Sequence, residues 1–180
     1  ILCKINNLKR GKTMILELNG IYAGLRFASA HIVFGHSSCG VIHGHSYYVD
    51  VKLCGAPAGE FGFVCDFKTL KNIVKETYGE LDHKLLVPTN HPNLKYITNG
   101  EDDSITFIFH KENKTKEYKI PSEDVVLLPL TSTTAEELSI YFAERIKNRL
   151  KELNEDSAIE WIEIMVNEGI GQGASYRLNF

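Results

Sequence analysis

An alternating run of polar and apolar residues between about Ile42 and Leu53 constrains the fold of this chain more than any other segment. Its apolar row continues, in the same register, the positions of His43 and His45. Because successive side chains of a β-strand point to opposite faces, both histidines lie on the face of the apolar row, which comprises Tyr47, Val49, Val51 and Leu53. Two imidazoles on one face can reach one metal ion. The run therefore predicts a strand whose inward face begins with two candidate metal ligands.

A third histidine, His31, ends another inward-facing row. The segment from Ile15 to His31 has a strand-like pattern with an inward row at its odd positions, namely Ile21, Ala23, Leu25, Phe27, Ser29 and His31. From a neighbouring strand, His31 would complete a set of three histidines. Three neutral nitrogens leave the fourth tetrahedral position of Zn²⁺ open to water or substrate, as in catalytic sites. The alternative is three unrelated imidazoles whose nitrogens are satisfied by backbone groups.

The loop before the histidine pair contains a thiol, Cys39. The segment from Phe34 to Ile42 is rich in glycine and serine, which is typical of a loop. A thiolate is the reactive form of cysteine, and a nearby Zn²⁺ ion or imidazolium favours it, so Cys39 is a candidate general base. Two alternatives are a fourth metal ligand that closes a structural site and a loop thiol without a role.

The composition of the 180-residue chain, 43% hydrophobic and 24% charged, is typical of one soluble globular domain. A formal net charge of −3, with both signs scattered, gives no reason to expect nucleic acid or a membrane surface as a partner. We find no run of about 18 apolar residues and no signal-peptide pattern, and we expect a cytoplasmic protein. The four cysteines form no CxxC pair, so we expect reduced thiols. We expect a polar extension over residues 1–13, a natural start at Met14 and one domain over residues 14–180.

The rest of the chain predicts two helices, a hairpin and further strands. Asp66 is a candidate N-cap for a helix that ends near Gly79. Residues Thr133 to Glu136 match a capping box, which predicts a second helix to about Leu153 with one apolar face. Residues 104–110 and 115–121 predict a hairpin inside an insertion over about residues 87–130. Residues 55–62 predict a turn between two strands, and residues 158–168 predict a further strand.

Three carboxylates are candidates for a site. Glu168 has the strand parity of an apolar row, so it faces inward and either pairs with a cation or accepts hydrogen bonds from a ligand. Glu136 is explained by the capping box, with a ligand role as the alternative. Asp82 precedes His83, and a carboxylate near an imidazole can fix its tautomer and raise its basicity. Most such pairs are nevertheless ordinary surface residues.

The order of motifs along the chain resembles that of a known enzyme family. The motifs are residues 27–31 (FASAH), 39–47 (CGVIHGHSY), 64–67 (VCDF), 81–84 (LDHK) and 134–138 (TAEEL), followed by Glu168. This set is similar to that of the 6-pyruvoyltetrahydropterin synthase and 6-carboxytetrahydropterin synthase family. The resemblance implies an α+β T-fold, an antiparallel sheet with two helices packed on one face, here with an extra hairpin. It also implies trimers that form a β-barrel and stack in pairs as a homohexamer.

The resemblance further assigns a metal centre and a base. It makes His31, His43 and His45 the ligands of a Zn²⁺ cofactor and Cys39 the general base. The implied substrate is a small molecule, 7,8-dihydroneopterin triphosphate.

The remaining roles follow from the same resemblance. Asp82 and His83 become a companion proton-transfer pair. Glu168 would anchor the pterin ring by accepting hydrogen bonds from its amino-pyrimidine N–H groups, and Thr134 and Glu136 would line the pocket.

The spacing of Cys39, four residues before His43, resembles the 6-carboxytetrahydropterin synthases of the queuosine and 7-deazaguanine route. The animal pyruvoyl enzymes have a longer spacing. We therefore expect a zinc-dependent lyase that releases triphosphate and acetaldehyde and forms 6-carboxytetrahydropterin. The alternatives are a 6-pyruvoyltetrahydropterin synthase, a dihydroneopterin-aldolase-like enzyme and a non-catalytic pterin- or metal-binding protein.

Overall fold

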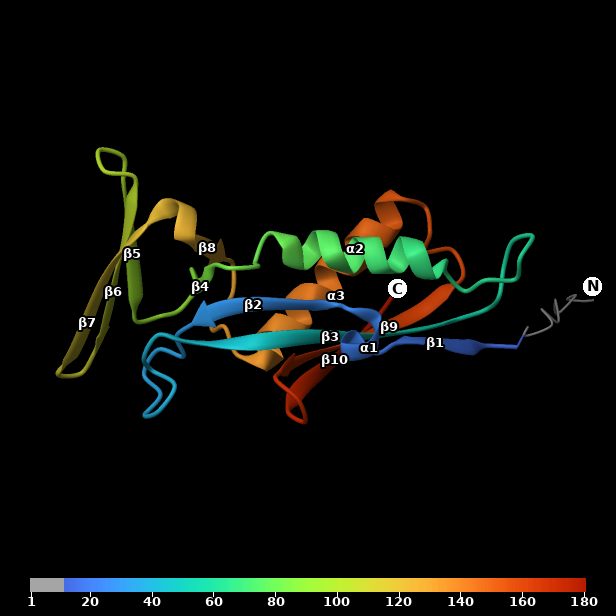
Figure 1. Ribbon diagram of the computed structural model, residues 1–180, viewed down its shortest axis with the longest axis horizontal. Helices are drawn as coiled ribbons and strands as arrows, with labels where there is room; N and C mark the ends of the chain where they lie inside the picture. Colours follow the sequence, from blue (N-terminus) through green and yellow to red (C-terminus); the bar gives the residue numbers. More distant parts are fainter. Residues whose placement is uncertain (1–11) are drawn as a thin grey trace, which may run out of the picture.

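The computed structural model describes residues 12–180, and its main element is a seven-stranded β-sheet covered on one face by two long helices (Figure 1). The helices are α2 (Phe67–Gly79) and α3 (Ala135–Glu152). The strands are β1 (Met14–Leu18), β2 (Arg26–His31), β3 (His43–Gly55), β4 (Leu85–Pro88), β8 (Val125–Leu128), β9 (Ile159–Glu168) and β10 (Gly173–Asn179). The predicted extension over residues 1–13 lies almost wholly outside the described residues.

The sheet has an antiparallel centre and two short parallel strands at one edge. Its strand order is β10-β9-β3-β2-β4-β8, and β1 pairs with the second half of β3. The pairs among β1, β2, β3, β9 and β10 are antiparallel, as predicted. Strand β4 instead runs parallel to both β2 and β8, so the whole sheet is mixed. This order makes β2 and β3, which carry the three candidate histidines, direct neighbours.

The main core lies between the sheet and the two helices, because all three present apolar faces to one another. The odd-numbered residues of β3 from Tyr47 to Leu53 are fully buried, as the alternation predicts. The helices contribute Leu70, Ile73 and Val74 from α2, and Leu138, Phe142, Ile146 and Leu150 from α3. The Asp66 carboxylate accepts a hydrogen bond from the Thr69 N–H at 2.9 Å, so α2 begins at the predicted cap.

The predicted strand from Ile15 to His31 is wrong in its middle, where a short helix, α1 (Gly20–Ala23), separates β1 from β2. The Asn19 side chain caps this turn by accepting the Tyr22 N–H at 3.2 Å. Gly20 lies so close to the β3 backbone at Val49 that no side chain fits there. As a result, Ile21 is exposed although it has the parity of the inward row.

Two other local predictions also differ from the structure. The turn over residues 55–62 leads to a single bridge between Ala58 and Phe63 and not to a paired strand. The capping box does not form: Thr134 is the N-cap of α3 and makes no side-chain capping bond. The Thr133 hydroxyl instead donates to the Ile32 carbonyl at 3.5 Å, because the segment before α3 packs against the end of β2.

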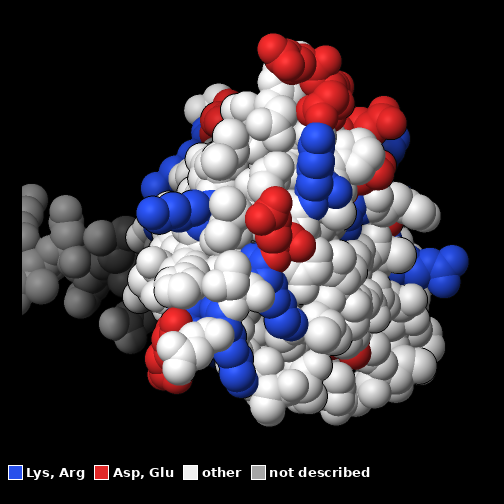
Figure 2. Space-filling view, turned by 90° about the vertical axis from the view of Figure 1, so that its left-hand side faces the viewer, with Lys and Arg blue, Asp and Glu red and all other residues white. Residues whose placement is uncertain are grey.

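The predicted insertion forms a second, three-stranded antiparallel sheet at one end of the molecule (Figure 1). Its strands are β5 (Leu94–Asn99), β6 (Ser104–Lys111) and β7 (Lys114–Pro121), and η1 (Ser122–Asp124) leads from it to β8. The hairpin of β6 and β7 confirms the prediction, whereas β5 was not predicted. A second apolar cluster joins this sheet to Ile32 and Phe34, which follow β2. Figure 2 faces this end and shows acidic side chains gathered at its top and lysine or arginine side chains below.

Within residues 12–180, no helix has both the length and the apolar composition needed to span a membrane.

Candidate metal centre and adjoining cavity

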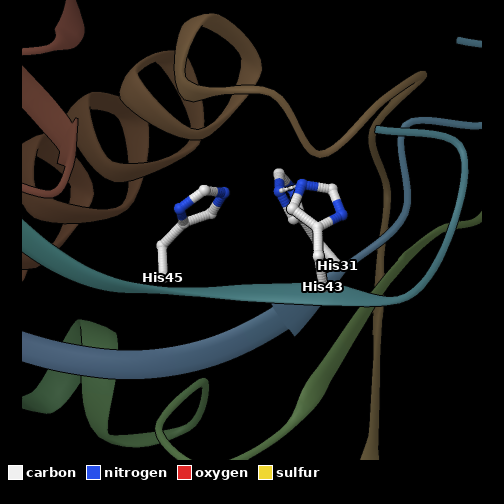
Figure 3. Close-up of side chains that lie close together, drawn as sticks. All are labelled: His31, His43 and His45. Carbon is white, nitrogen blue, oxygen red and sulfur yellow. Dashed lines mark hydrogen bonds between the residues drawn. The ribbon is translucent and has the colours of Figure 1, made fainter. Parts of the chain in front are cut away.

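The three predicted histidines converge at one end of the main sheet (Figure 3). His31 on β2 is the direct cross-strand partner of His43 on β3, and His45 lies two residues further along β3. One ring nitrogen from each of the three lies within 4.8 Å of the other two. The structure therefore confirms the proximity that strand parity predicts.

Backbone carbonyls determine which ring nitrogens of two histidines face the centre. The Nδ1 atom of His31 lies 2.7 Å from the Thr133 carbonyl oxygen, and Nδ1 of His43 lies 2.8 Å from the Val41 carbonyl oxygen. Because a carbonyl oxygen only accepts hydrogen bonds, each Nδ1 carries a proton. In neutral rings the Nε2 atoms then present lone pairs, and these two atoms lie only 3.0 Å apart. A cation between them would relieve the repulsion of the lone pairs.

Burial keeps the first of these rings neutral. His31 is 1% exposed. Burial lowers its pKa to about 4, while the Thr133 carbonyl opposes the shift and the two neighbouring histidines add to it. At pH 7 the His31 ring is therefore a neutral donor of an electron pair, which is the form that binds a metal.

Within residues 12–180, the ring of the third histidine, His45, is not held by a hydrogen bond at its Nε2 atom. His45 Nε2 is buried and has no hydrogen-bond partner among the described residues, and its nearest carboxylate oxygen is Glu168 Oε2 at 3.9 Å. A buried polar atom without a partner is costly, and a metal ion would satisfy it. In a tetrahedral zinc site with Zn–N bonds of about 2.1 Å, ligand nitrogens lie roughly 3.4 Å apart. The separations found here, from 3.0 Å to no more than 4.8 Å, bracket that value, so the residues fit a zinc ion.

A cavity of about 310 Å³ opens beside the histidines. Most of the residues predicted for the site line it, namely His31, Cys39, His43, Thr134, Glu136 and Glu168. Glu168, at the end of β9, pairs in register with Tyr47 on β3, which brings its half-buried carboxylate to the end of the sheet that carries the three histidines. The cavity thus combines a candidate metal centre, a thiol and a carboxylate.

Hydrogen bonds within its own loop fold Cys39 back toward β2. The Val33 N–H donates to the Cys39 carbonyl at 2.9 Å, and the Cys39 N–H donates to His36 Nδ1 at 3.0 Å. The next residue, Gly40, leaves no space for a side chain because the His36 carbonyl packs against its Cα. The loop is compact, and its thiol reaches the wall of the cavity.

The predicted pair Asp82 and His83 lies apart from this cavity. Asp82 Oδ1 accepts the Ala28 N–H at 2.8 Å, and its Oδ2 lies 3.1 Å from Nδ1 of His83, which is 82% exposed. His83 borders a different, more open depression whose lining includes Ala28, Gly44 and the candidate ligand His45. Within one chain, therefore, His83 and Cys39 line separate cavities.

Several groups at the candidate centre are not evident from the sequence. The carbonyls of Thr133 and Val41 carry no side-chain signal, so only the structure identifies them. His36 and Gln172 also line the cavity. The spacing of His36, three residues before Cys39 in a glycine- and serine-rich loop, was a usable signal.

Comparisons with known proteins give consistent matches. A family model described as 6-pyruvoyl tetrahydropterin synthase matches residues 20–179. A protein of Methanocaldococcus jannaschii, provisionally named 6-carboxy-5,6,7,8-tetrahydropterin synthase, is 63% identical over 164 residues, which are 91% of this chain and 96% of that protein. A Pyrococcus horikoshii protein with the same provisional name is 33% identical over 150 residues, 82% of this chain and 83% of its own.

A solved structure also resembles this one. The Plasmodium falciparum 6-pyruvoyl tetrahydropterin synthase superposes with a TM-score of 0.82 at 26% identity, covering 94% of this chain and 100% of that chain. The match confirms the predicted α+β T-fold.

Proposed function

Because this chain belongs to the 6-pyruvoyl tetrahydropterin synthase family, we propose that it is a zinc-dependent 6-carboxy-5,6,7,8-tetrahydropterin synthase. Two relatives with that product in their names support the choice over a pyruvoyl synthase. The observation that carries the proposal is the convergence of His31, His43 and His45 beside a cavity that also holds Cys39 and Glu168. The reaction would convert 7,8-dihydroneopterin triphosphate and one water molecule to 6-carboxytetrahydropterin, with loss of triphosphate and acetaldehyde, a step toward queuosine or related 7-deazaguanines.

The histidines would hold the zinc ion through their Nε2 atoms. A bound zinc ion supplies Lewis acidity, which stabilises negative charge that develops on a substrate oxygen. The protein's part is to orient the rings, and the Thr133 and Val41 carbonyls support this by fixing a proton of His31 and of His43 on Nδ1.

The thiol and the carboxylate would act on the two ends of the substrate. As a thiolate, Cys39 removes a proton from the side chain of the pterin. The Glu168 carboxylate accepts hydrogen bonds from the N–H groups of the amino-pyrimidine ring, which offers the donors that a half-buried carboxylate needs. Thr134 and Glu136, at the start of α3, line the wall of the cavity.

We further propose that the active enzyme is a homohexamer in which Asp82 and His83 serve the cavity of a neighbouring subunit. The separation of this pair from Cys39 in one chain and the high exposure of His83 support this arrangement. The protein would act on this small molecule in the cytoplasm.

Product analysis tests the proposed function. The zinc-loaded protein, incubated with 7,8-dihydroneopterin triphosphate, should release acetaldehyde and 6-carboxytetrahydropterin. A 6-pyruvoyl product without acetaldehyde would identify a pyruvoyl synthase, and release of glycolaldehyde triphosphate would identify an aldolase-like enzyme. Pterin binding without turnover would support the alternative of a non-catalytic pterin-binding protein.

A substitution tests the role of the thiol. Cys39→Ala should abolish turnover and leave the zinc content intact. Loss of zinc together with activity would make Cys39 a metal ligand and contradict its assignment as the base.

A further inference from the structure

The inserted sheet of β5, β6 and β7 lies at the same end of the molecule as the loop that carries Cys39 (Figure 1). That loop covers residues 32–42, between β2 and β3, and is called the Cys39 loop below. No role in the proposed function uses the inserted sheet. Its contacts with the Cys39 loop are therefore not explained by the proposed function alone.

The first contact is polar and lies one peptide away from the thiol. The Lys116 ammonium, on β7, donates a hydrogen bond to the carbonyl oxygen of Gly40. Lys116 is partly buried, so its charge is shielded from solvent more than that of an ordinary surface lysine. Lys119 on the same strand pairs with Asp102, and Lys114 has neither a hydrogen bond nor an ion pair from its side chain within residues 12–180.

The second contact is apolar. Phe34, in the Cys39 loop, is 8% exposed and stacks on Phe109 of β6 with ring centres 5.4 Å apart. His91, which precedes β5, contacts both rings at 5.8 and 5.7 Å. Aromatic groups at these separations attract each other beyond the effect of burial alone. The cluster fixes one end of the loop to the inserted sheet, and Lys116 fixes the other.

The backbone of the Cys39 loop is also restrained by its own conformation and hydrogen bonds. Gly35, next to Phe34, has a φ of 88°, and a side chain there would also meet Phe109. The backbone bond from Val33 to Cys39 closes the loop on itself. The contacts with the inserted sheet add to these internal restraints and determine where the loop lies over the cavity.

We propose that the inserted sheet holds the Cys39 loop in place over the metal-site cavity and that Lys116 is the positioning residue of this contact. The consequence for turnover rests on the proposed function, in which Cys39 is the base. The holding contact itself does not rest on it. A general base loses rate steeply when it is displaced by about 1 Å, so a group that fixes the loop changes turnover without touching the substrate.

The test compares three variants of the full, zinc-loaded protein. Lys116→Met removes the ammonium and keeps an unbranched side chain, Lys116→Arg retains a cationic donor, and Lys114→Met is the matched control on the same face of the same strand. The measurements are amide hydrogen exchange of residues 33–41, zinc content, melting temperature, and kcat and KM.

In Lys116→Met we expect the amide hydrogen-exchange rate of the Cys39 loop to rise about tenfold, because the hydrogen bond to the Gly40 carbonyl is lost. We expect kcat to fall about tenfold with KM, zinc content and melting temperature little changed, and Lys116→Arg to recover most of both effects. Lys114→Met should behave as the unchanged protein.

Three results would overturn the proposal. They are unchanged exchange in the loop of Lys116→Met, equal effects of Lys116→Met and Lys114→Met, and faster exchange at an unchanged kcat. If the unchanged protein has no lyase activity, the proposed function fails, and the exchange measurement still decides whether Lys116 holds the loop.

Discussion

The ring orientations in the candidate metal centre depend on backbone carbonyls as well as on the histidines. Reversing the tautomer of His31 or His43 would place a proton on the Nε2 atom that faces the other ring, and would leave Nδ1 and the Thr133 or Val41 carbonyl oxygen without a shared proton. His45 differs from both, because its Nε2 is buried without a partner. Removal of each ring should therefore have a different effect on the stability of the metal-free protein.

Because Nε2 of His45 has no hydrogen-bond partner in the part of the chain that the structure describes, we expect removal of this ring to weaken zinc binding strongly but to change the stability of the metal-free protein little. In His45→Ala, zinc affinity should fall about a hundredfold or more, because one of three ligands is lost. The metal-free variant should melt within roughly 3 °C of the unchanged protein, since removing a buried atom without a partner forfeits no hydrogen bond. Melting curves with and without added zinc measure both effects.

A matched control is His110→Ala, which removes an exposed imidazole of the inserted sheet whose partner is Thr115. It should keep the full rise in melting temperature on addition of zinc. An equally large zinc-induced rise in His45→Ala would show that this residue is not a ligand.

Single residues of the centre were predictable where the side-chain pattern carries the information. The parity of His31, His43 and His45 places them on one face, and Glu168 follows the same rule on β9. The Thr133 carbonyl was not predictable, because its position depends on how the segment before α3 packs on the end of β2. The Val41 carbonyl lies only two residues before His43, but a backbone group has no side-chain pattern that would identify it as a partner. The alternating pattern predicts which side chains face inward, but it does not predict which backbone groups they contact.

Among the elements, the inserted sheet has a titratable group in its contact with the Cys39 loop. Burial lowers the pKa of His91 below its ordinary 6.5, the Lys111 charge adds to the shift, and the Phe34 backbone opposes it. The unfolded chain therefore binds a proton more readily than the folded protein. The stabilising contribution is complete above pH 6.5 and is lost as the pH falls through the folded pKa.

We expect the free energy of unfolding to decrease more between pH 7.5 and 5 in the unchanged protein than in His91→Gln, which cannot titrate at this position. Urea unfolding of both metal-free proteins at the two pH values measures the difference. Histidines elsewhere titrate equally in both and cancel in the comparison. An identical decrease in the two proteins would contradict the assignment of His91 as a neutral packing group.

Prediction of the elements succeeded where periodicity was long and failed where it was short. Helix α3 spans five turns of regular apolar spacing, and its course was predicted although its capping box was not formed. Helix α1 has four residues, fewer than any periodic pattern needs, and its signals were the local ones of Asn19 and Gly24. Strand β5 exposes most of its side chains and is held by backbone pairing with β6, so its sequence shows no inward row.

At the scale of the whole molecule, the chain has open edges and a divided set of candidate catalytic groups. In the described chain β10 pairs only with β9, and β1 pairs only with β3, so each strand has one edge free for another chain. Asp82 accepts a hydrogen bond from the backbone of β2 at Ala28, and His83 lines a depression separate from the cavity of Cys39. The ordered motifs predicted the T-fold correctly, but motif order alone does not tell whether two motifs meet within one chain or between chains.

Mixing inactive variants tests whether the pair serves a neighbouring subunit. Cys39→Ala and His83→Ala should each be nearly inactive. Dissociated together and reassembled in equal amounts, they should regain up to about a quarter of full activity, because random assembly places an intact Cys39 cavity beside an intact Asp82–His83 pair at that frequency. The control mixes Cys39→Ala with Glu168→Ala: both residues line one cavity, so no assembled site is complete and activity stays low. Absence of recovery in the first mixture, with mixed oligomers demonstrated by mass spectrometry, would mean that the pair acts within its own chain or not at all.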